Sequence, residues 1–136
     1  MAENTTFVQK DQSVDNAAYL SAGLRDVPGL TLPVVQPGCK HVFHLYPIQI
    51  EAAQFGRTKD DFVYAMLYER GVKVGTHYTP LHYATAFQKR GFRKGQFPAA
   101  EGVAERLVTL PIHPRLTTEA LDYLIDSIRH FSPLGK

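Results

Sequence analysis

The spacing of apolar residues predicts one clear helix near the middle of the chain. Phe62, Val63 and Met66 fall on a single helix face, because side chains three or four positions apart lie above one another. Thr58 precedes this stripe and is a favourable N-cap. Gly71 follows it and can adopt the left-handed conformation that commonly ends a helix. The pattern therefore predicts a helix over residues 59–70.

A second clear helix is predicted near the C-terminus. It is expected to start at Thr117 or Thr118 and to end before Pro133, because proline cannot continue the backbone hydrogen bonding of a helix. Its core-facing stripe consists of Leu121, Leu124, Ile125 and Ile128. The start, the stripe and the end together define this helix.

Three further helices are also expected. The first is capped by Ser13 or Asp15 and ends at Pro28. The second covers residues 83–89. The third begins at Pro98, since proline is well tolerated at the first helical position, and runs to Arg106.

Runs rich in β-branched and aromatic residues predict three strands, His41–Ile50, Val72–Tyr78 and Leu107–Leu110. Leu30–Val35 is expected to be extended chain. Pro47 lies inside the first strand and lacks an amide donor, so this strand is expected to lie at a sheet edge or to end there.

The order of these elements predicts an α+β fold. We expect a two-layer domain in which a small three-stranded, mainly antiparallel sheet has helices packed on one face. Residues 1–12 are polar and aperiodic and are expected to form a flexible tail. Residues 13–136 then form a single domain, a size that suits one core.

Composition and charge narrow the class of protein. The 136 residues are 44% hydrophobic and 21% charged, which is typical of a soluble globular domain. The formal charge of +2 is too small to predict a nucleic-acid or membrane partner. Cys39 is the single cysteine, so no intrachain disulfide forms, and a reducing cytoplasm is the expected location.

The spacing of the histidines and of the acidic residues gives little indication of a metal site or of an acid–base pair. His41 and His44 point to opposite faces of a strand, and no zinc-ligand spacing occurs, so no metal site is predicted. Glu101 and Glu105 share a helix face and are expected to be exposed and mildly repulsive. No pair of carboxylates is typical of acid–base catalysis.

A basic loop contains the residues Lys89, Arg90, Arg93 and Lys94, placed among Phe87, Phe92 and Phe97. One hypothesis is a phosphate contact, to a nucleotide sugar or to single-stranded RNA. The predicted strands lack the aromatic pattern of RNA-binding sheets. We therefore favour a solvated loop whose Phe side chains anchor it to the core.

Four segments occur together in a distinctive order: Ala17–Leu20 with Pro28–Leu30, then Gly71–His82, Phe97–Glu101 and Leu110–Thr117. Together they resemble the C-terminal part of the DegT/DnrJ/EryC1/StrS aminotransferases, which make amino sugars on nucleotide carriers. The resemblance covers roughly residues 13–131.

The resemblance implies a fold-type-I aminotransferase plan, in which a large domain binds pyridoxal phosphate and a small C-terminal domain closes the active site. None of the seven lysines lies in a segment like the lysine segment of the family. Pyridoxal chemistry needs such an amine. We therefore predict no catalytic residue, no cofactor bound by this chain alone, and pyridoxal phosphate only with a separately encoded large domain.

The resemblance also implies a binding loop. In the family this loop faces the mouth of the active site, so His77, Tyr78 and His82 are the predicted substrate-binding residues and could donate hydrogen bonds to a sugar or phosphate. The alternative is that these three are half-buried loop residues satisfied by the backbone.

A domain that packs on a larger one keeps an apolar face, and this face predicts self-association, most simply as a two-fold dimer.

The expected function is a non-catalytic part or remnant of an aminotransferase. Two alternatives are a small-ligand binding module for a nucleotide sugar or pyridoxal phosphate, and a structural or self-association domain. RNA binding ranks below these.

Overall fold

The computed structural model describes the backbone of residues 5–135 and the side chains of residues 12–135. Its helices are α1 (Thr5–Leu24), α2 (Ala52–Phe55), α3 (Lys59–Tyr68), α4 (Thr85–Gln88), α5 (Pro98–Ala104) and α6 (Thr118–Phe131). Its strands are β1 (Leu30–Thr31), β2 (Tyr46–Ile50) and β3 (Leu107–Leu110), and two short 3-10 turns are η1 (Leu81–Tyr83) and η2 (Pro133–Gly135). The predicted α+β class with a small antiparallel sheet is confirmed.

The sheet has the order β1-β2-β3, and both neighbouring pairs are antiparallel. The expectation that the strand His41–Ile50 lies at a sheet edge or ends at Pro47 is wrong, because β2 is central and runs from Tyr46 to Ile50. The backbone N–H of Ile50 donates to the Arg106 carbonyl on the β3 side, so by alternation the Pro47 nitrogen faces the opposite side. There β1 reaches only to Thr31, opposite Gln49. Proline is tolerated because β1 does not extend to it.

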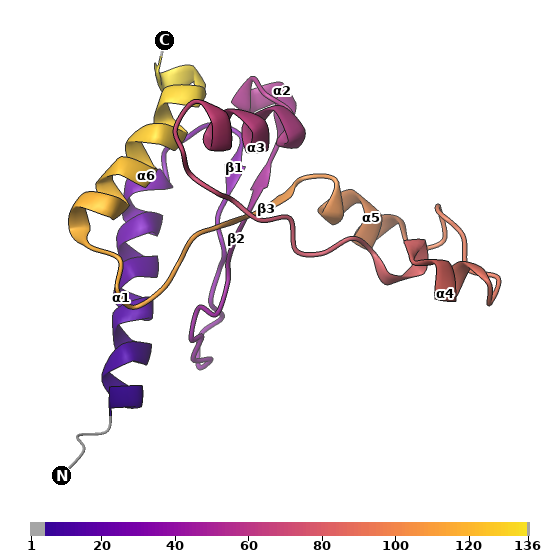
Figure 1. The fold of residues 1–136 in the computed structure, drawn as a ribbon, viewed down its shortest axis with the longest axis horizontal. Coiled ribbons are helices and arrows are strands. Elements are labelled where there is room, and N and C mark those ends of the chain that lie inside the picture. The colour runs from indigo at the N-terminus through magenta and orange to yellow at the C-terminus, as the bar shows by residue number, and fades with distance from the viewer. Residues whose placement is uncertain (1–4, 136) are drawn as a thin grey trace.

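The predicted strand over Val72–Tyr78 is also wrong. Only Gly75 pairs with the sheet, exchanging two hydrogen bonds of 2.8 and 2.7 Å with Thr109. Beyond Gly75 the chain turns away from β3, so the following residues have no strand to pair with (Figure 1). The third strand of the sheet is instead β1, from the segment expected only to be extended.

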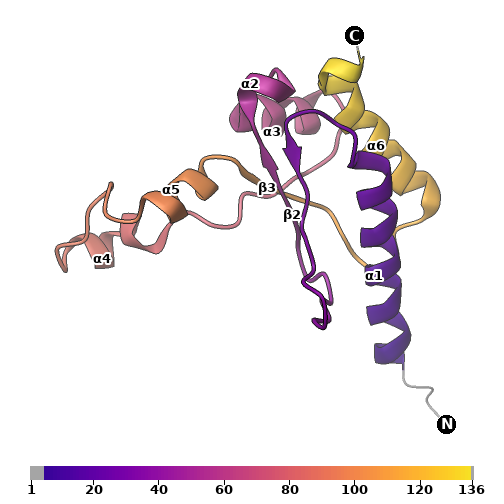
Figure 2. The same cartoon turned by 180° about the vertical axis from the view of Figure 1, so that it is seen from behind.

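Helices α1 and α6 lie side by side along one side of the sheet (Figures 1 and 2). A Cβ added to Gly23 of α1 would lie 2.5 Å from Cδ1 of Ile125 in α6, so the two helices approach closely there. At the end of the pair, Arg129 binds both carboxylate oxygens of Asp26 at 2.7 and 2.9 Å. The apolar core beneath includes Leu20, Leu24, Tyr46, Ile48, Phe62, Met66, Val108, Leu110 and Ile128.

α1 begins at Thr5, earlier than the predicted start at Ser13 or Asp15. No glycine or proline occurs between Thr5 and Asp15, so nothing in this stretch interrupts helical hydrogen bonding. The helix therefore extends into the segment predicted to be a tail. Residues 1–4 of that predicted tail lie outside the described residues.

The two best-defined predictions are confirmed with their caps. Thr58 Oγ1 accepts from the Asp61 N–H at 3.2 Å, and Gly71 has a positive φ of 65° after α3. Thr117 Oγ1 accepts from the Ala120 N–H at 3.3 Å at the start of α6. These caps depend on neighbours in sequence, which is why the sequence located them.

Residues 79–104, which we call the arm, contain η1, α4 and α5. The arm projects from the sheet on the side away from α1 and α6 (Figures 1 and 2). It contains the predicted helices over 83–89 and 98–106 in shorter form. None of the described helices is long and apolar enough to cross a membrane.

Candidate functional site

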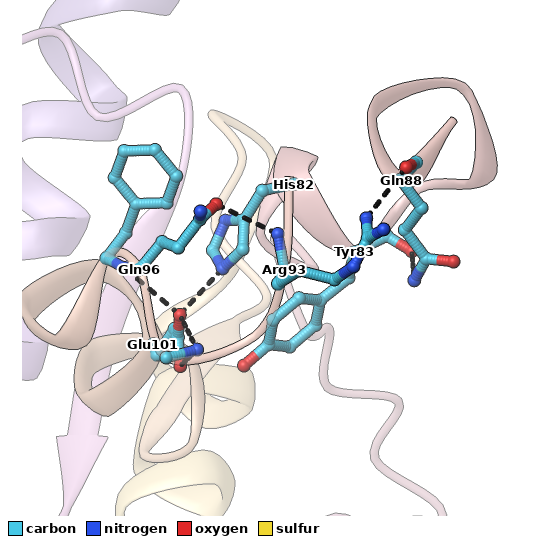
Figure 3. Close-up of polar contacts among 8 residues, drawn as sticks. His82, Tyr83, Gln88, Arg93, Gln96 and Glu101 are labelled. Atoms are coloured by element: carbon cyan, nitrogen blue, oxygen red, sulfur yellow. Dashed lines mark hydrogen bonds and ion pairs between the residues drawn. The ribbon is translucent and has the colours of Figure 1, made fainter. Parts of the chain in front are cut away.

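The arm is held together by a buried contact between His82 and Glu101. His82 Nε2 lies 2.8 Å from Glu101 Oε1, and the two residues are only 7% and 8% exposed. Glu101 also accepts hydrogen bonds from the backbone N–H groups of Gly95 and Phe97. Figure 3 shows His82 and Glu101 facing each other across the arm. One carboxylate thus joins η1, the turn before α5 and α5 itself.

The surroundings shift the pKa of two side chains in the arm, Glu101 and Tyr83. Burial alone pushes the pKa of Glu101 upward, but the hydrogen bonds from His82, Gly95 and Phe97 outweigh it and hold the pKa below its ordinary value. Burial, with the nearby Glu101 charge second, raises the pKa of Tyr83. Glu101 is therefore stabilised as a carboxylate, and Tyr83 as a neutral phenol.

A row of neighbouring aromatic rings runs through the arm, in which Phe92 and Phe97 are 36% and 44% exposed. The His82 and Phe97 rings lie 4.8 Å apart, Phe97 and Phe92 lie 6.1 Å apart, and Phe92 and Phe87 lie 5.9 Å apart between centroids. The expectation that these Phe side chains anchor the loop to the main core is wrong. They pack on one another and on His82, because the arm projects away from the sheet.

A pocket of about 210 Å³ lies where the arm meets β3 and α3. Its lining residues are Lys59, Thr76, His77, Tyr78, Thr79, Pro80, Tyr83, Lys94, Glu101, Ala104, Glu105 and Leu107. We call it the base pocket. It combines two cationic side chains with carboxylates and hydroxyl groups, a mixture able to bind a polar ligand.

His77 is held against the backbone of the sheet. A Cβ added to Gly75 would overlap the His77 ring and lie 2.7 Å from its Nδ1, so the ring occupies the space that the missing side chain leaves. His77 Nδ1 and Thr109 Oγ1 are buried and have no hydrogen-bond partner among the described residues. The ring position therefore depends on a glycine two residues earlier.

Tyr78 lies beside His77, with ring centroids 4.9 Å apart, and is 73% exposed. The structure thus brings two of the three predicted binding residues into the base pocket. His82 does not line it, because its ring points into the arm toward Glu101. His82 is therefore placed to order the arm.

Sequence reasoning missed the lining residues Lys59, Tyr83 and Glu101, and it named Lys94 only as part of a basic loop. The expectation of an exposed, repulsive Glu101–Glu105 pair is wrong, since Glu101 is buried and hydrogen-bonded and only Glu105 is exposed. The sequence did contain an indication that Glu101 is hydrogen-bonded. Glu101 lies in the first turn of a helix that begins at Pro98, and acidic side chains at this place commonly accept hydrogen bonds from free backbone amides.

The described lysines do not fit a covalent anchor for pyridoxal phosphate. Lys40, Lys73, Lys89 and Lys94 are exposed. Lys59 is partly buried in the base pocket, but its Nζ donates to the Ala104 carbonyl at 3.2 Å and lies 3.8 Å from Asp60. The Lys59 amine is thus engaged with a backbone carbonyl rather than free to form an imine. Among the described residues, no group of three metal-ligating side chains occurs.

Known proteins share this fold. The crystal structure of DesV from S. venezuelae superposes with a TM-score of 0.82 and 29% identity, covering 92% of this chain and 32% of that one. The structure of the aminotransferase TlmJ from Streptoalloteichus hindustanus superposes with a TM-score of 0.77 and 27% identity, covering 90% and 31%. These likenesses give the chain the fold of a segment of aminotransferases.

Sequence comparison names the family. The chain belongs to the DegT/DnrJ/EryC1/StrS aminotransferase family, whose pattern matches residues 7–129. It is 34% identical to the erythromycin biosynthesis sensory transduction protein EryC1 of Saccharopolyspora erythraea, over 83% of this chain and 29% of that protein. It is 33% identical to the dTDP-3-amino-3,4,6-trideoxy-alpha-D-glucose transaminase of Streptomyces venezuelae, over 85% and 29%. The chain therefore spans less than a third of the length of these relatives.

Proposed function

We propose that these residues act as the C-terminal small domain of a pyridoxal-phosphate-dependent nucleotide-sugar aminotransferase and do not transfer amino groups by themselves. The observation that carries the proposal is the base pocket, in which His77 and Tyr78 lie together beside Lys59 and Lys94. The family membership supports the reaction class. The cofactor, when a large domain supplies it, provides the chemistry of amino-group transfer.

In this proposal the chain binds and orients the sugar nucleotide. Tyr78, being exposed beside the pocket, offers a hydroxyl to a sugar, and His77 offers Nε2. Lys59 and Lys94 lie in the same lining as Glu101 and Glu105, so the pocket offers both donors and acceptors to a polar ligand. The arm, ordered by His82 and Glu101, forms one wall of the pocket.

A chimera tests the proposal. Residues 7–129 replace the matched segment of the S. venezuelae transaminase, which supplies the rest of the enzyme. We expect the chimera to keep the visible absorbance of its cofactor and to transfer amino groups, and we expect Tyr78→Ala to lower kcat/KM. Val34→Ala, an exposed apolar position outside the base pocket, is the matched control. A folded, cofactor-loaded chimera without activity contradicts the proposal.

The non-catalytic part has its own test. The 136-residue chain is incubated with pyridoxal phosphate, an amino donor and a nucleotide keto-sugar, and no amino transfer is expected. Transfer by the purified chain alone contradicts this part of the proposal. A pocket that binds the nucleotide sugar equally well in the chain and in an inactive chimera instead favours a binding module.

The proposal also includes a two-fold dimer in a reducing cytoplasm. Tyr64, Leu67 and Tyr68 form an exposed apolar patch on α3, with the two Tyr rings 4.4 Å apart, and such patches favour association. The exposed Cys39 is compatible with a reducing compartment. Light scattering that shows a strict monomer at high concentration contradicts the dimer.

A further inference from the structure

The arm concentrates positive charge. No Asp or Glu occurs between Glu69 and Glu101. The turn after α4 contains the cationic residues Lys89, Arg90, Arg93 and Lys94. The whole chain carries a formal charge of only +2, so the excess is local to the tip of the arm. A local excess of this kind attracts anions.

The same turn forms a second pocket, which we call the tip pocket. Its volume is about 430 Å³, and its lining residues are Thr85, Gln88, Lys89, Phe92, Arg93 and Lys94. This size suits a small ligand. Three of the lining side chains are cationic and none is acidic, so the pocket selects for negative charge.

Hydrogen bonds hold two of the side chains that line the tip pocket, Arg93 and Gln88, before any ligand binds. Arg93 Nη1 donates to the carbonyl groups of Gln88 and Phe92, at 2.9 and 2.8 Å. The Arg93 N–H donates to Gln96 Oε1 at 2.9 Å, and Gln88 Nε2 donates to the Tyr83 carbonyl at 3.0 Å. Figure 3 shows Arg93 between Gln88 and Gln96. A guanidinium has five N–H donors, so donors remain for an anion, and a preformed site loses less entropy on binding.

The tip pocket and the base pocket share a wall. Lys94 lines both of them, and its Nζ lies 5.8 Å from the centre of the Tyr83 ring. One ligand that is negatively charged at one end and polar at the other can therefore contact both pockets through a single lysine.

We propose that the tip pocket binds the diphosphate group of a small phosphate ester, with charge from Lys89 and Lys94 and directed donors from Arg93. The identification of that ester as a nucleotide sugar rests on the proposed function, whereas the phosphate site does not. Single-stranded nucleic acid is less suited, because it stacks successive bases on aromatic rings, and Phe92 is the one aromatic side chain that lines the tip pocket. Phe92 and Phe97 are partly exposed, and their ring centroids lie 6.1 Å apart.

The test is an NMR titration of the full chain with inorganic pyrophosphate, following the backbone amides. We expect shifts confined to residues 85–94. The double variant Lys89→Gln/Lys94→Gln should weaken binding by about 10-fold or more, since charge-assisted hydrogen bonds are lost. The matched control, Lys40→Gln/Arg115→Gln, removes the same charge at exposed positions outside the arm and should change the affinity less than about twofold.

Three results overturn the proposal: no shift at about 10 mM pyrophosphate, equal weakening in the control variant, or tighter binding of a single-stranded oligonucleotide than of pyrophosphate. UDP-glucose then separates the two proposals. Binding stronger than that of pyrophosphate, with added shifts at residues 76–80, supports both. Binding no stronger than that of pyrophosphate leaves the phosphate site in place and counts against the nucleotide-sugar function.

Discussion

His82 Nε2 lies 2.8 Å from Glu101 Oε1, and this contact joins two segments of the arm that are 19 residues apart. The carboxylate also accepts from the Gly95 and Phe97 amides. The helices of the arm make few close contacts with the helices and strands of the main core. The order of the arm, and with it one wall of the base pocket, therefore depends on this carboxylate.

Replacing Glu101 with Gln should loosen the arm while the core stays folded. The amide side chain cannot accept from all three donors with the strength of a carboxylate. We expect faster hydrogen exchange at Gly95 and Phe97 and little change at Ile48. Glu105→Gln, at an exposed position one turn further along, is the control and should leave exchange unchanged. Equal protection of Gly95 in the Glu101 variant contradicts the prediction.

The order of the arm should also depend on pH. The pKa of Glu101 is held below its ordinary value of 4.5 in the folded chain, so the folded arm binds fewer protons than the unfolded arm. Its contribution to stability is full above pH 4.5 and is lost as the pH falls through the lowered pKa. Hydrogen exchange at Phe97, measured from pH 6 downward and corrected for the intrinsic rate, checks this. Protection that increases on acidification contradicts the sign.

Replacing Gly75 with Ala should move the His77 ring. The new Cβ would overlap that ring, and the ring must leave the backbone because two atoms cannot share the space. We expect changed ring chemical shifts of His77 and weaker ligand binding in the base pocket. If the ring chemical shifts of His77 stay unchanged in the Gly75→Ala variant, the close approach to Gly75 does not set the position of the His77 ring.

Gly102→Ala is the matched control for Gly75. Nothing lies within 4 Å of a Cβ at this position inside α5, and its φ is not positive. Alanine is favoured over glycine within a helix by roughly 0.5–1 kcal/mol. We expect slower local opening of α5, read from hydrogen exchange, and no change at His77. Faster opening contradicts the assignment of Gly102 to a helix interior.

Replacing Ile128 with Ala should destabilise the whole domain. Ile128 is fully buried in the core below α6, and a buried large-to-small change leaves a cavity that costs about 2–5 kcal/mol. Urea unfolding measures this loss. Asp126→Ala, at an exposed position on the same helix, should change the free energy of unfolding by less than about 0.5 kcal/mol. A similar loss in both variants contradicts the placement of the core.

The sequence by itself determined the features that depend on near neighbours. The caps at Thr58 and Thr117, the apolar stripe of α6 and the left-handed Gly71 were all predictable, because their hydrogen bonds and faces span only a few residues. The resemblance to a family placed His77 and Tyr78 together in one binding loop. It did not identify the other residues that line the base pocket.

The tertiary structure decided what depends on distant partners. Pro47 lies in a central strand because β1 ends at Thr31, and the residues after Gly75 form no strand because the chain leaves the sheet there. Glu101 is buried because His82 reaches it from another segment. None of these contacts leaves a periodic pattern in the sequence, since each one depends on where a second segment comes to lie.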